Sequence, residues 1–329
     1  MVGTVSAAAT NAPAAAQSAA AGSAATGSEA TGSAATESAA IGSPATGSAA
    51  TPAQANASAL TDEVVASAAA CEDARLRLVF ESLVRHLHAF VEEVQLTPEE
   101  WLAGVRFLTA TGHKCDDYRQ EFMMLSDTLG VTSLVDEIAH RRSTGASDSS
   151  VLGPFYTENP PEAAYGASIA AEGCGVPLAV RGYVRDPDGR AIADAVVDVW
   201  GTDGEGLYDS QHGGHVVDCR GRVRTADDGS FAFKTVFPQS YSIPTDGPVG
   251  AMLQRLGRHT FRPAHLHFRI SADGFVPLTT AIYAADDPYL ASDAVFGVRA
   301  SLIEDFPREP VTGTATLARN FTLARASAA

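Results

Sequence analysis

The hydrophobic period of this chain changes near residue 150, and that change constrains the fold more than any other feature of the sequence. Up to about residue 143, apolar residues recur every three or four positions, as in "ARLRLVFESLVRHLHAFVEEV". This spacing is typical of amphipathic helices. From about residue 150 the period becomes two, as in "HLHFRIS", and turn sequences such as "ADDG" and "ADGFVP" separate the runs. Alternation with frequent turns predicts short antiparallel strands.

Capping residues predict where the helices of the first half begin and end. Thr61 precedes "DEVVASAA" as an expected N-cap. In "TPEEWLAGVRFL", Thr97 is the expected N-cap, Pro98 takes the first helical position and Glu100 completes a capping box. "DDYRQEFMMLSDTLG" ends on Gly130, a favourable C-terminal stop. With "VTSLVDEIAHRR", the segment is expected to form a short series of helices.

The second half is expected to form an antiparallel β-sandwich or barrel. Its predicted strands cover residues 178–184, 195–202, 221–225, 230–237, 265–271 and 278–284. The sequence therefore predicts an α+β protein with a helical domain over residues 59–148 and a β-sandwich over residues 149–329.

Residues 1–58 are expected to form a disordered tail, because they consist almost entirely of Ala, Ser, Gly and Thr. The segment has no aromatic residue and no Lys or Arg, and such a stretch cannot bury enough apolar surface to offset its chain entropy. It lacks the charged start and continuous apolar core of a secretory signal, and it is not Arg-rich like a transit peptide. No apolar run is long enough to span a membrane.

Charge and cysteine usage narrow the class of protein. The formal net charge of −16 argues against a nucleic-acid-binding protein. The four cysteines are scattered without a C-x-x-C pair, so neither a zinc knuckle nor a disulfide framework is indicated. We expect a cytoplasmic protein. Trp101 and Trp200 are expected to be core aromatic residues, and His212 and His215 are expected to be exposed in a Gly-rich loop.

Two H-x-H pairs raise the question of a metal site. His86 and His88 fall in the helical segment, where residues two apart point about 200° away from each other and do not face one ion. His265 and His267 fall in a predicted strand, where residues two apart project from the same face. The strand pair could therefore hold a metal, although packing or hydrogen bonding would also explain it.

Two tyrosines could complete such a site. Tyr208 in "TDGEGLYDSQ" and Tyr241 in "FPQSYSIPTDGP" stand where turns meet strands. Phenol has a pKa near 10, so only a strongly Lewis-acidic ion would hold it ionised at neutral pH. Two tyrosinates with two imidazoles would favour ferric iron over zinc. Spacing alone leaves open that both tyrosines are ordinary turn and core residues.

The motifs resemble those of the intradiol ring-cleavage dioxygenases, non-haem ferric enzymes that open catechols between their two hydroxyl groups. The resemblance covers about residues 60–325 and rests on "GLYD", "VLGPFY" and "SYSIPTDGPVGAMLQRLGRHTFRPAHLHFRI". Carried over by position, it implies that one Fe(III) per subunit is bound by four ligands, and that Arg262 is the active-site arginine. The implied ligands are Tyr208, Tyr241, His265 and His267.

The resemblance also implies an architecture and partners. Members of the family combine a helical N-terminal domain, which forms much of a homodimer interface, with a β-sandwich that carries the iron. Several bind a phospholipid in an apolar tunnel between the helical domains. The substrates are a small aromatic diol or triol and O2. The Ala-rich tail departs from the family pattern, and no catalytic role is expected for it.

Within the family the chain looks most like the hydroxyquinol 1,2-dioxygenases, as "LSDTLGVTSLVDEI", "SVLGPFYTENPP" and "SDAVFGV" indicate. Asp127 could accept a hydrogen bond from an additional ring hydroxyl, and a site built for a polar group rejects analogues that lack it. Asp127 could instead cap a helix or pair with an arginine. The residues that match the substrate pocket of this subfamily are Met124, Asp127, Val151, Leu152, Gly153, Pro154, Phe155, Ile243, Pro244, Arg262 and Val295.

The implied reaction opens benzene-1,2,4-triol with O2 to 3-hydroxy-cis,cis-muconate, the enol form of maleylacetate, in the degradation of aromatic compounds. Tyr241 would take one proton from the substrate as it leaves the metal, and Arg262 would stabilise charge that develops on the ring. Two alternatives remain. A catechol or chlorocatechol 1,2-dioxygenase would share the metal but not the pocket, and a metal-free β-sandwich binding module would share only the architecture.

Overall fold

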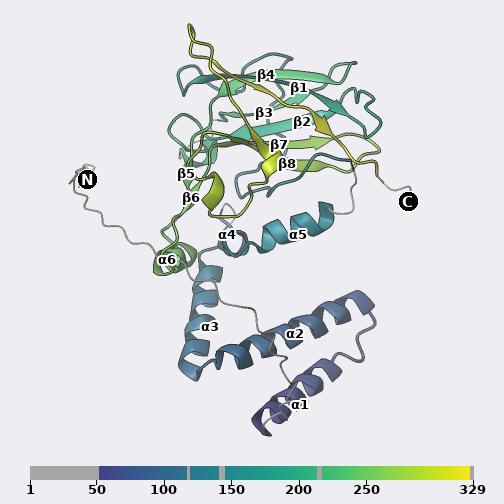
Figure 1. Ribbon diagram of the computed structural model, residues 1–329, viewed down its shortest axis with the longest axis vertical. Helices are drawn as coiled ribbons and strands as arrows, with labels where there is room; N and C mark the ends of the chain where they lie inside the picture. The colour runs from purple at the N-terminus through teal and green to yellow at the C-terminus, as the bar shows by residue number, and fades with distance from the viewer. Residues whose placement is uncertain (1–51, 117–118, 141–144, 213–216, 327–329) are drawn as a thin grey trace, which may run out of the picture. The chain divides into compact units, whose positions relative to one another are not determined.

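The structure is a computed structural model that describes residues 52–116, 119–140, 145–212 and 217–326 (Figure 1). The chain divides into two compact units, residues 1–90 and 91–329. Residues 1–51, most of the predicted tail, lie outside the described residues. The predicted domain boundary between residues 148 and 149 falls inside the second unit and stays a prediction.

The first unit contains α1 (Pro52–Ala66) and most of α2 (Ala74–Val94). The prediction of Thr61 as an N-cap is wrong, because α1 already begins at Pro52 and Thr61 lies within it. The Ala-rich run before Thr61 has high helix propensity, and proline is favoured at a first helical position. The side chain of Thr61 instead lies 2.8 Å from Nδ1 of His88.

Four helices belong to the second unit: α3 (Pro98–His113), α4 (Glu121–Thr128), α5 (Val131–His140) and α6 (Pro248–Arg255). The predicted capping box before α3 is confirmed, since Thr97 and Glu100 each accept from the other's backbone N–H. Trp101 is 60% exposed on α3, so its prediction as a core residue is wrong: the outer face of this helix is not covered within the chain. None of the helices in the described residues is long and apolar enough to cross a membrane.

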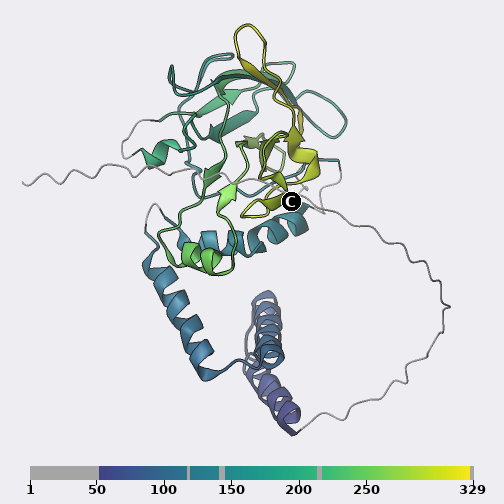
Figure 2. The same cartoon turned by 60° about the vertical axis from the view of Figure 1, so that its left-hand side comes forward.

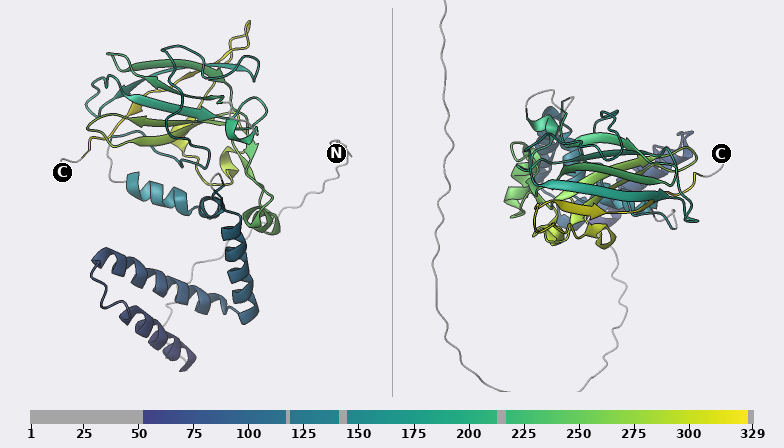
Figure 3. Two further views of the ribbon diagram at one scale, coloured as in Figure 1. Left: turned by 180° about the vertical axis from the view of Figure 1, so that it is seen from behind. Right: turned by 90° about the horizontal axis from the view of Figure 1, so that it is seen from above.

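The β half forms two packed layers of strands (Figure 3). One sheet joins β1 to β4, β10 and β11, and the other has the order β3-β2-β7-β8-β9. A separate ribbon pairs β5 (Tyr241–Ser242) with β6 (Phe261–Arg262). The bounds are β1 Pro177–Arg185, β2 Val196–Gly201, β3 Arg220–Arg224, β4 Ser230–Val236, β7 His265–Ser271, β8 Leu278–Ala284, β9 Ile303–Glu304, β10 Ala315–Ala318 and β11 Phe321–Thr322.

The long strands pair in the expected antiparallel way: β1 with β4, β2 with β3 and β7, and β7 with β8. The short C-terminal strands differ from the expectation, because β10 and β11 run parallel to β1 and β9 runs parallel to β8. Parallel pairs need long connections rather than tight turns, so the turn sequences that revealed the other strands gave no signal for these.

The two faces of β7 have different surroundings. Leu266, Phe268 and Ile270 are buried in the core between the sheets, where Phe231 and Phe233 of β4 also lie. Each such side chain contributes roughly 1.5–3 kcal/mol by burial. The opposite face carries the two histidines of the H-x-H motif. Figure 2 shows α4, α5 and α6 lying together beside the sandwich.

Candidate active site

His265 and His267 project side by side from β7, as strand geometry predicts. Both are 1% exposed, and their Nε2 atoms lie 3.0 Å apart. Burial, with the nearby Arg262 charge, lowers the pKa of His265 to about 3. Burial and the neighbouring His265 lower the pKa of His267 well below its usual value. Both rings are therefore neutral at pH 7, the form in which imidazole binds metals.

Each ring is held by different neighbours. Nδ1 of His265 lies 2.6 Å from the carbonyl oxygen of Pro263, so Nδ1 carries the proton and Nε2 presents its lone pair to the site. The ring of His267 stacks on Trp200 of β2 at 4.7 Å and 5°. The prediction that Trp200 is a core residue is confirmed, since it is 1% exposed.

Tyr208 reaches the histidines from the connection between β2 and β3. Its Oη lies 3.4 Å from Nε2 of His265, and its ring stacks on Phe155 at 4.2 Å. The position is fixed by the 3-10 helix η1 (Asp209–Gln211), because Asp209 accepts two hydrogen bonds from Arg220, of 2.8 and 2.6 Å. Burial raises the pKa of Tyr208 well above its usual value, so only a bound cation would ionise this phenol.

Tyr241 is the fourth member of the group. It begins β5 and is paired with Arg262 of β6, whose Nη1 donates to its Oη at 3.4 Å. The rings of Tyr241 and Tyr208 are perpendicular, with centroids 5.3 Å apart. Nη1 of Arg262 also lies 3.2 Å from Nε2 of His265. The guanidinium group therefore contacts one phenol oxygen and one imidazole nitrogen, and the other two donor atoms lie against Nε2 of His265.

Arg262 is held by a buried network that the sequence did not reveal. Asp293 accepts from its Nε at 3.1 Å and from its Nη2 at 3.3 Å, and Oη of Tyr283 lies 3.1 Å from Nη2. Burial alone would raise the pKa of Asp293, but the adjacent guanidinium brings it below the usual value. "SDAVFGV" contains Asp293 and was singled out as a motif, whereas Tyr283 lies in a strand pattern without any distinguishing signal.

A small enclosed pocket adjoins these groups. Leu152, which was predicted to belong to it, does not line it and is 39% exposed: the chain on either side of Leu152 faces the pocket, but its own side chain points to solvent. Gly153 has a φ of 71°, and a Cβ there would lie 3.6 Å from Nε2 of His267. The lining consists of Met124, Asp127, Val151, Gly153, Pro154, Phe155, Tyr241, Ile243, Pro244, Arg262 and Val295.

Asp127 is the acidic member of this lining. It lies near the C-terminal end of α4, so it does not act as an N-cap, and among the described residues no arginine forms an ion pair with it. Its side chain is 6% exposed. Burial raises the pKa of Asp127 above its usual value, against the opposing effects of a hydrogen bond from Thr132 and the Arg262 charge.

His212, Arg258 and His259 do not line this pocket. His212 forms a 2.6 Å contact with Asp203 and its side chain is 43% exposed, whereas His215 lies outside the described residues. A larger, more open hollow is lined by Arg258 and His259 among others. Arg258 donates to the carbonyl oxygens of Thr128 and Ala294, so it connects the C-terminal end of α4 to the turn that contains Ala294.

Comparison with known proteins identifies this arrangement. Residues 151–324 match the family described as "Dioxygenase", and residues 73–147 match "Catechol dioxygenase N terminus". A hydroxyquinol 1,2-dioxygenase of Rhizobium sp. is 46% identical over 75% of this chain and 84% of its own length. The chain belongs to the intradiol ring-cleavage dioxygenase family. This is a family of non-haem iron enzymes.

Other members of the intradiol family differ in their degree of similarity. The solved structure of hydroxyquinol 1,2-dioxygenase from Pseudomonas putida is 46% identical, with a TM-score of 0.77, and the match covers 83% of this chain and 99% of that one. A catechol 1,2-dioxygenase of Candida albicans is 36% identical over 76% of this chain and 84% of its own length. The chain is thus more similar to these hydroxyquinol dioxygenases than to this catechol dioxygenase.

The donor atoms of this intradiol dioxygenase fit an iron ion. Two nitrogens that bind one metal at about 2.1 Å and at a right angle are roughly 3 Å apart, and the two Nε2 atoms are separated by 3.0 Å. The imidazoles are neutral, and the two phenols can supply anionic oxygen. These residue types suit a ferric ion.

Proposed function

We propose that this dioxygenase cleaves hydroxyquinol, benzene-1,2,4-triol, with O2 to 3-hydroxy-cis,cis-muconate, in the breakdown of aromatic compounds. The observation that carries the proposal is the buried carboxylate of Asp127 in an otherwise mostly apolar pocket that also contains Tyr241 and Arg262. An unsubstituted catechol would give that carboxylate no donor from the substrate, whereas a third ring hydroxyl would donate to it.

We propose one Fe(III) per subunit, held by Tyr208, Tyr241, His265 and His267. The proposal is supported by the 3.0 Å separation of the two Nε2 atoms and by the buried phenols beside them. When bound at these residues, a ferric ion would supply Lewis-acid activation of the substrate ring toward O2.

The chain's own residues would then act on the substrate in three ways. Oη of Tyr241 would accept a proton from a substrate hydroxyl. Arg262, held by Asp293, would place its guanidinium charge where negative charge develops on the ring. The apolar lining, including Val151 and Ile243, would exclude water from the reacting carbons.

Oxygen uptake tests the substrate proposal. The purified, iron-loaded protein is given benzene-1,2,4-triol and catechol side by side, with correction for autoxidation of the triol. We expect a preference for the triol that Asp127→Ala reduces by at least about tenfold in kcat/KM, with a smaller loss on catechol. Asp127→Asn keeps an oxygen acceptor of the same shape, so it should retain more triol activity than Asp127→Ala.

Several outcomes would count against the proposal. Preference for catechol would favour a catechol or chlorocatechol 1,2-dioxygenase, and an equal loss on both substrates in Asp127→Ala would remove Asp127 as the selectivity residue. A colourless protein that neither binds iron nor takes up O2 would favour a metal-free binding module, because tyrosinate bound to ferric iron absorbs visible light.

We also propose a homodimer formed through the helical region. Exposed apolar side chains along α2, such as Leu76, Leu83 and Leu87, support an interface there. A phospholipid between the helical regions and a cytoplasmic location are further proposals that follow from family resemblance. Light scattering would give the oligomeric state, and mass spectrometry of an organic extract would detect a bound lipid.

A further inference from the structure

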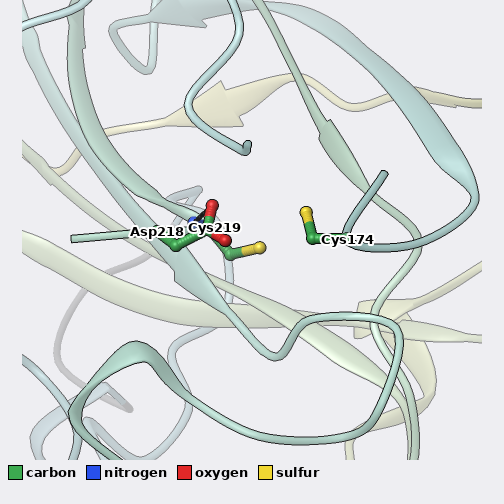
Figure 4. Close-up of side chains that lie close together, drawn as sticks. All are labelled: Cys174, Asp218 and Cys219. Atoms are coloured by element: carbon green, nitrogen blue, oxygen red, sulfur yellow. Dashed lines mark hydrogen bonds between the residues drawn. The ribbon is translucent and has the colours of Figure 1, made fainter. Parts of the chain in front are cut away.

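Two cysteines that are far apart in the sequence meet a carboxylate in the β half. Cys174 precedes β1, whereas Asp218 and Cys219 lead into β3. One ligand atom from each residue lies within 4.8 Å of the others. Figure 4 shows the sulfur of Cys219 directed toward Cys174, with Asp218 beside it. The scattered cysteine spacing in the sequence gave no sign of this cluster.

Hydrogen bonds from backbone N–H groups hold the segment around Cys174 and the segment around Cys219 in place. Oδ1 of Asp218 accepts from the N–H of Ala171 and from that of Cys219, both at 2.8 Å, so one carboxylate joins the two segments. The carbonyl oxygen of Cys174 accepts from Gly204 at 2.7 Å. A Cβ at Gly204 would lie 2.8 Å from that same oxygen, so the approach depends on glycine.

We propose that Cys174, Asp218 and Cys219 form a binding site for one thiophilic divalent cation of the Zn²⁺ or Cd²⁺ class. Thiolate sulfur selects such ions, and two sulfurs with one carboxylate provide three of the four ligands of a tetrahedral site. A water molecule would complete the coordination. The His/Tyr donor set, with its phenol oxygens, suits a harder ion, so the two sites differ in the metals they favour.

A disulfide is the main competing use of this pair, and the surroundings of the sulfurs disfavour it. Burial and the neighbouring Asp218 charge raise the pKa of both Cys174 and Cys219. Protonated thiols are poor nucleophiles and oxidise slowly. A cation, by contrast, displaces the thiol protons as it binds and stabilises the thiolates directly.

The site is connected to the candidate active site through β3. Cys219 is followed by Arg220, whose two hydrogen bonds to Asp209 fix the residue after Tyr208. A cation that binds only the folded protein also stabilises it by mass action. Occupation of the thiol site is therefore expected to raise the melting temperature of the whole protein.

Cadmium is the probe we would use, on the full-length, iron-loaded protein kept under a phosphine reductant. We expect one equivalent of Cd²⁺ to bind in addition to the iron, with an ultraviolet sulfur-to-cadmium absorption band and a raised melting temperature. Cys174→Ser and Cys219→Ser should each abolish the band. A Cys71→Ser/Cys115→Ser double variant, which removes the other two thiols, should keep both the band and the shift.

Two results would overturn the thiol site. One is a band that persists in Cys174→Ser, a half-buried position where serine fits readily. The other is cadmium binding that occurs only as iron is released. Neither readout requires turnover, so a failure of the hydroxyquinol proposal and a failure of the thiol site remain distinguishable.

Discussion

The two H-x-H pairs of this chain have the same spacing and opposite geometry. In β7, the Nε2 atoms of His265 and His267 are 3.0 Å apart. In α2, the side chains separate: Nδ1 of His86 lies 2.8 Å from the carbonyl oxygen of Ser82, and Nδ1 of His88 lies 2.8 Å from the hydroxyl of Thr61. In a strand, residues two apart lie on the same face, whereas in a helix with 3.6 residues per turn they point in different directions.

The surroundings of the pairs differ as much as their directions. The strand pair is fully buried beside a guanidinium group and two phenols, whereas His86 is exposed. Whether an H-x-H pair can bind one metal ion therefore depends on its secondary structure as well as on its residue types.

The largest effect is expected from removal of one strand histidine. His267→Ala deletes a proposed ligand. Iron content should therefore fall, and turnover should fall by more than about a hundredfold. Elemental analysis and oxygen uptake measure the two. His86→Ala is the matched control on the helix and should leave both unchanged; iron loss in that variant would break the distinction between the pairs.

A smaller effect is expected from the network behind the strand pair. Asp293→Asn weakens the buried partner of Arg262, which should lower kcat by about ten- to a hundredfold and destabilise the fold by up to about 3 kcal/mol. KM should change less than kcat if Arg262 acts on the transition state. The control is Asp194→Asn, whose pair with Arg224 is exposed, and its melting temperature and kcat should not change.

Alanine substitutions at two glycines distinguish the effect of backbone strain from the effect of a side chain placed close to the histidines. Gly153 and Gly189 have φ values of 71° and 80°, so alanine should cost each about 1–2 kcal/mol in unfolding free energy. Only Gly153 lies beside Nε2 of His267, and an added Cβ at Gly189 meets open space. Gly153→Ala should therefore also lower kcat/KM several-fold; equal activity in the two variants would show that this proximity is unimportant.

The smallest effect is expected from the helix pair itself. His88→Ala removes the contact with Thr61, which should lower the free energy of unfolding by about 1 kcal/mol without changing iron content. Denaturant unfolding measures the loss, and Thr61→Val should reproduce it. A change in visible absorption of the iron-loaded His88→Ala protein would contradict the separation of the two pairs.

Much of this fold was predictable because its period and turn signals are local. The capping box at Thr97 and the strand assignment of "HLHFRIS" needed only neighbouring residues, and both are confirmed. The short parallel strands β9, β10 and β11 were not predicted, since their partners are distant in the sequence. Trp101 was assigned to a core because sequence hydrophobicity does not say which apolar faces the chain itself covers.

The candidate site also contains some residues that the sequence indicated and others that it did not. Family motifs indicated the four donor residues and most of the pocket lining, whereas the buried ion pair of Asp293 with Arg262 and the meeting of Cys174 with Cys219 depend on tertiary contacts. Neither pair has a spacing that marks it in the sequence.

The two faces of β7 limit which substitutions such an enzyme can accept. Because its opposite faces carry the sandwich core and the histidine pair, a substitution that loosens one face disturbs the other. Asp127 stands on α4, outside the two sheets. With the proposed roles of Asp127 and the histidine pair, substrate choice can diverge along a helix while the proposed histidine ligands stay on a buried core strand.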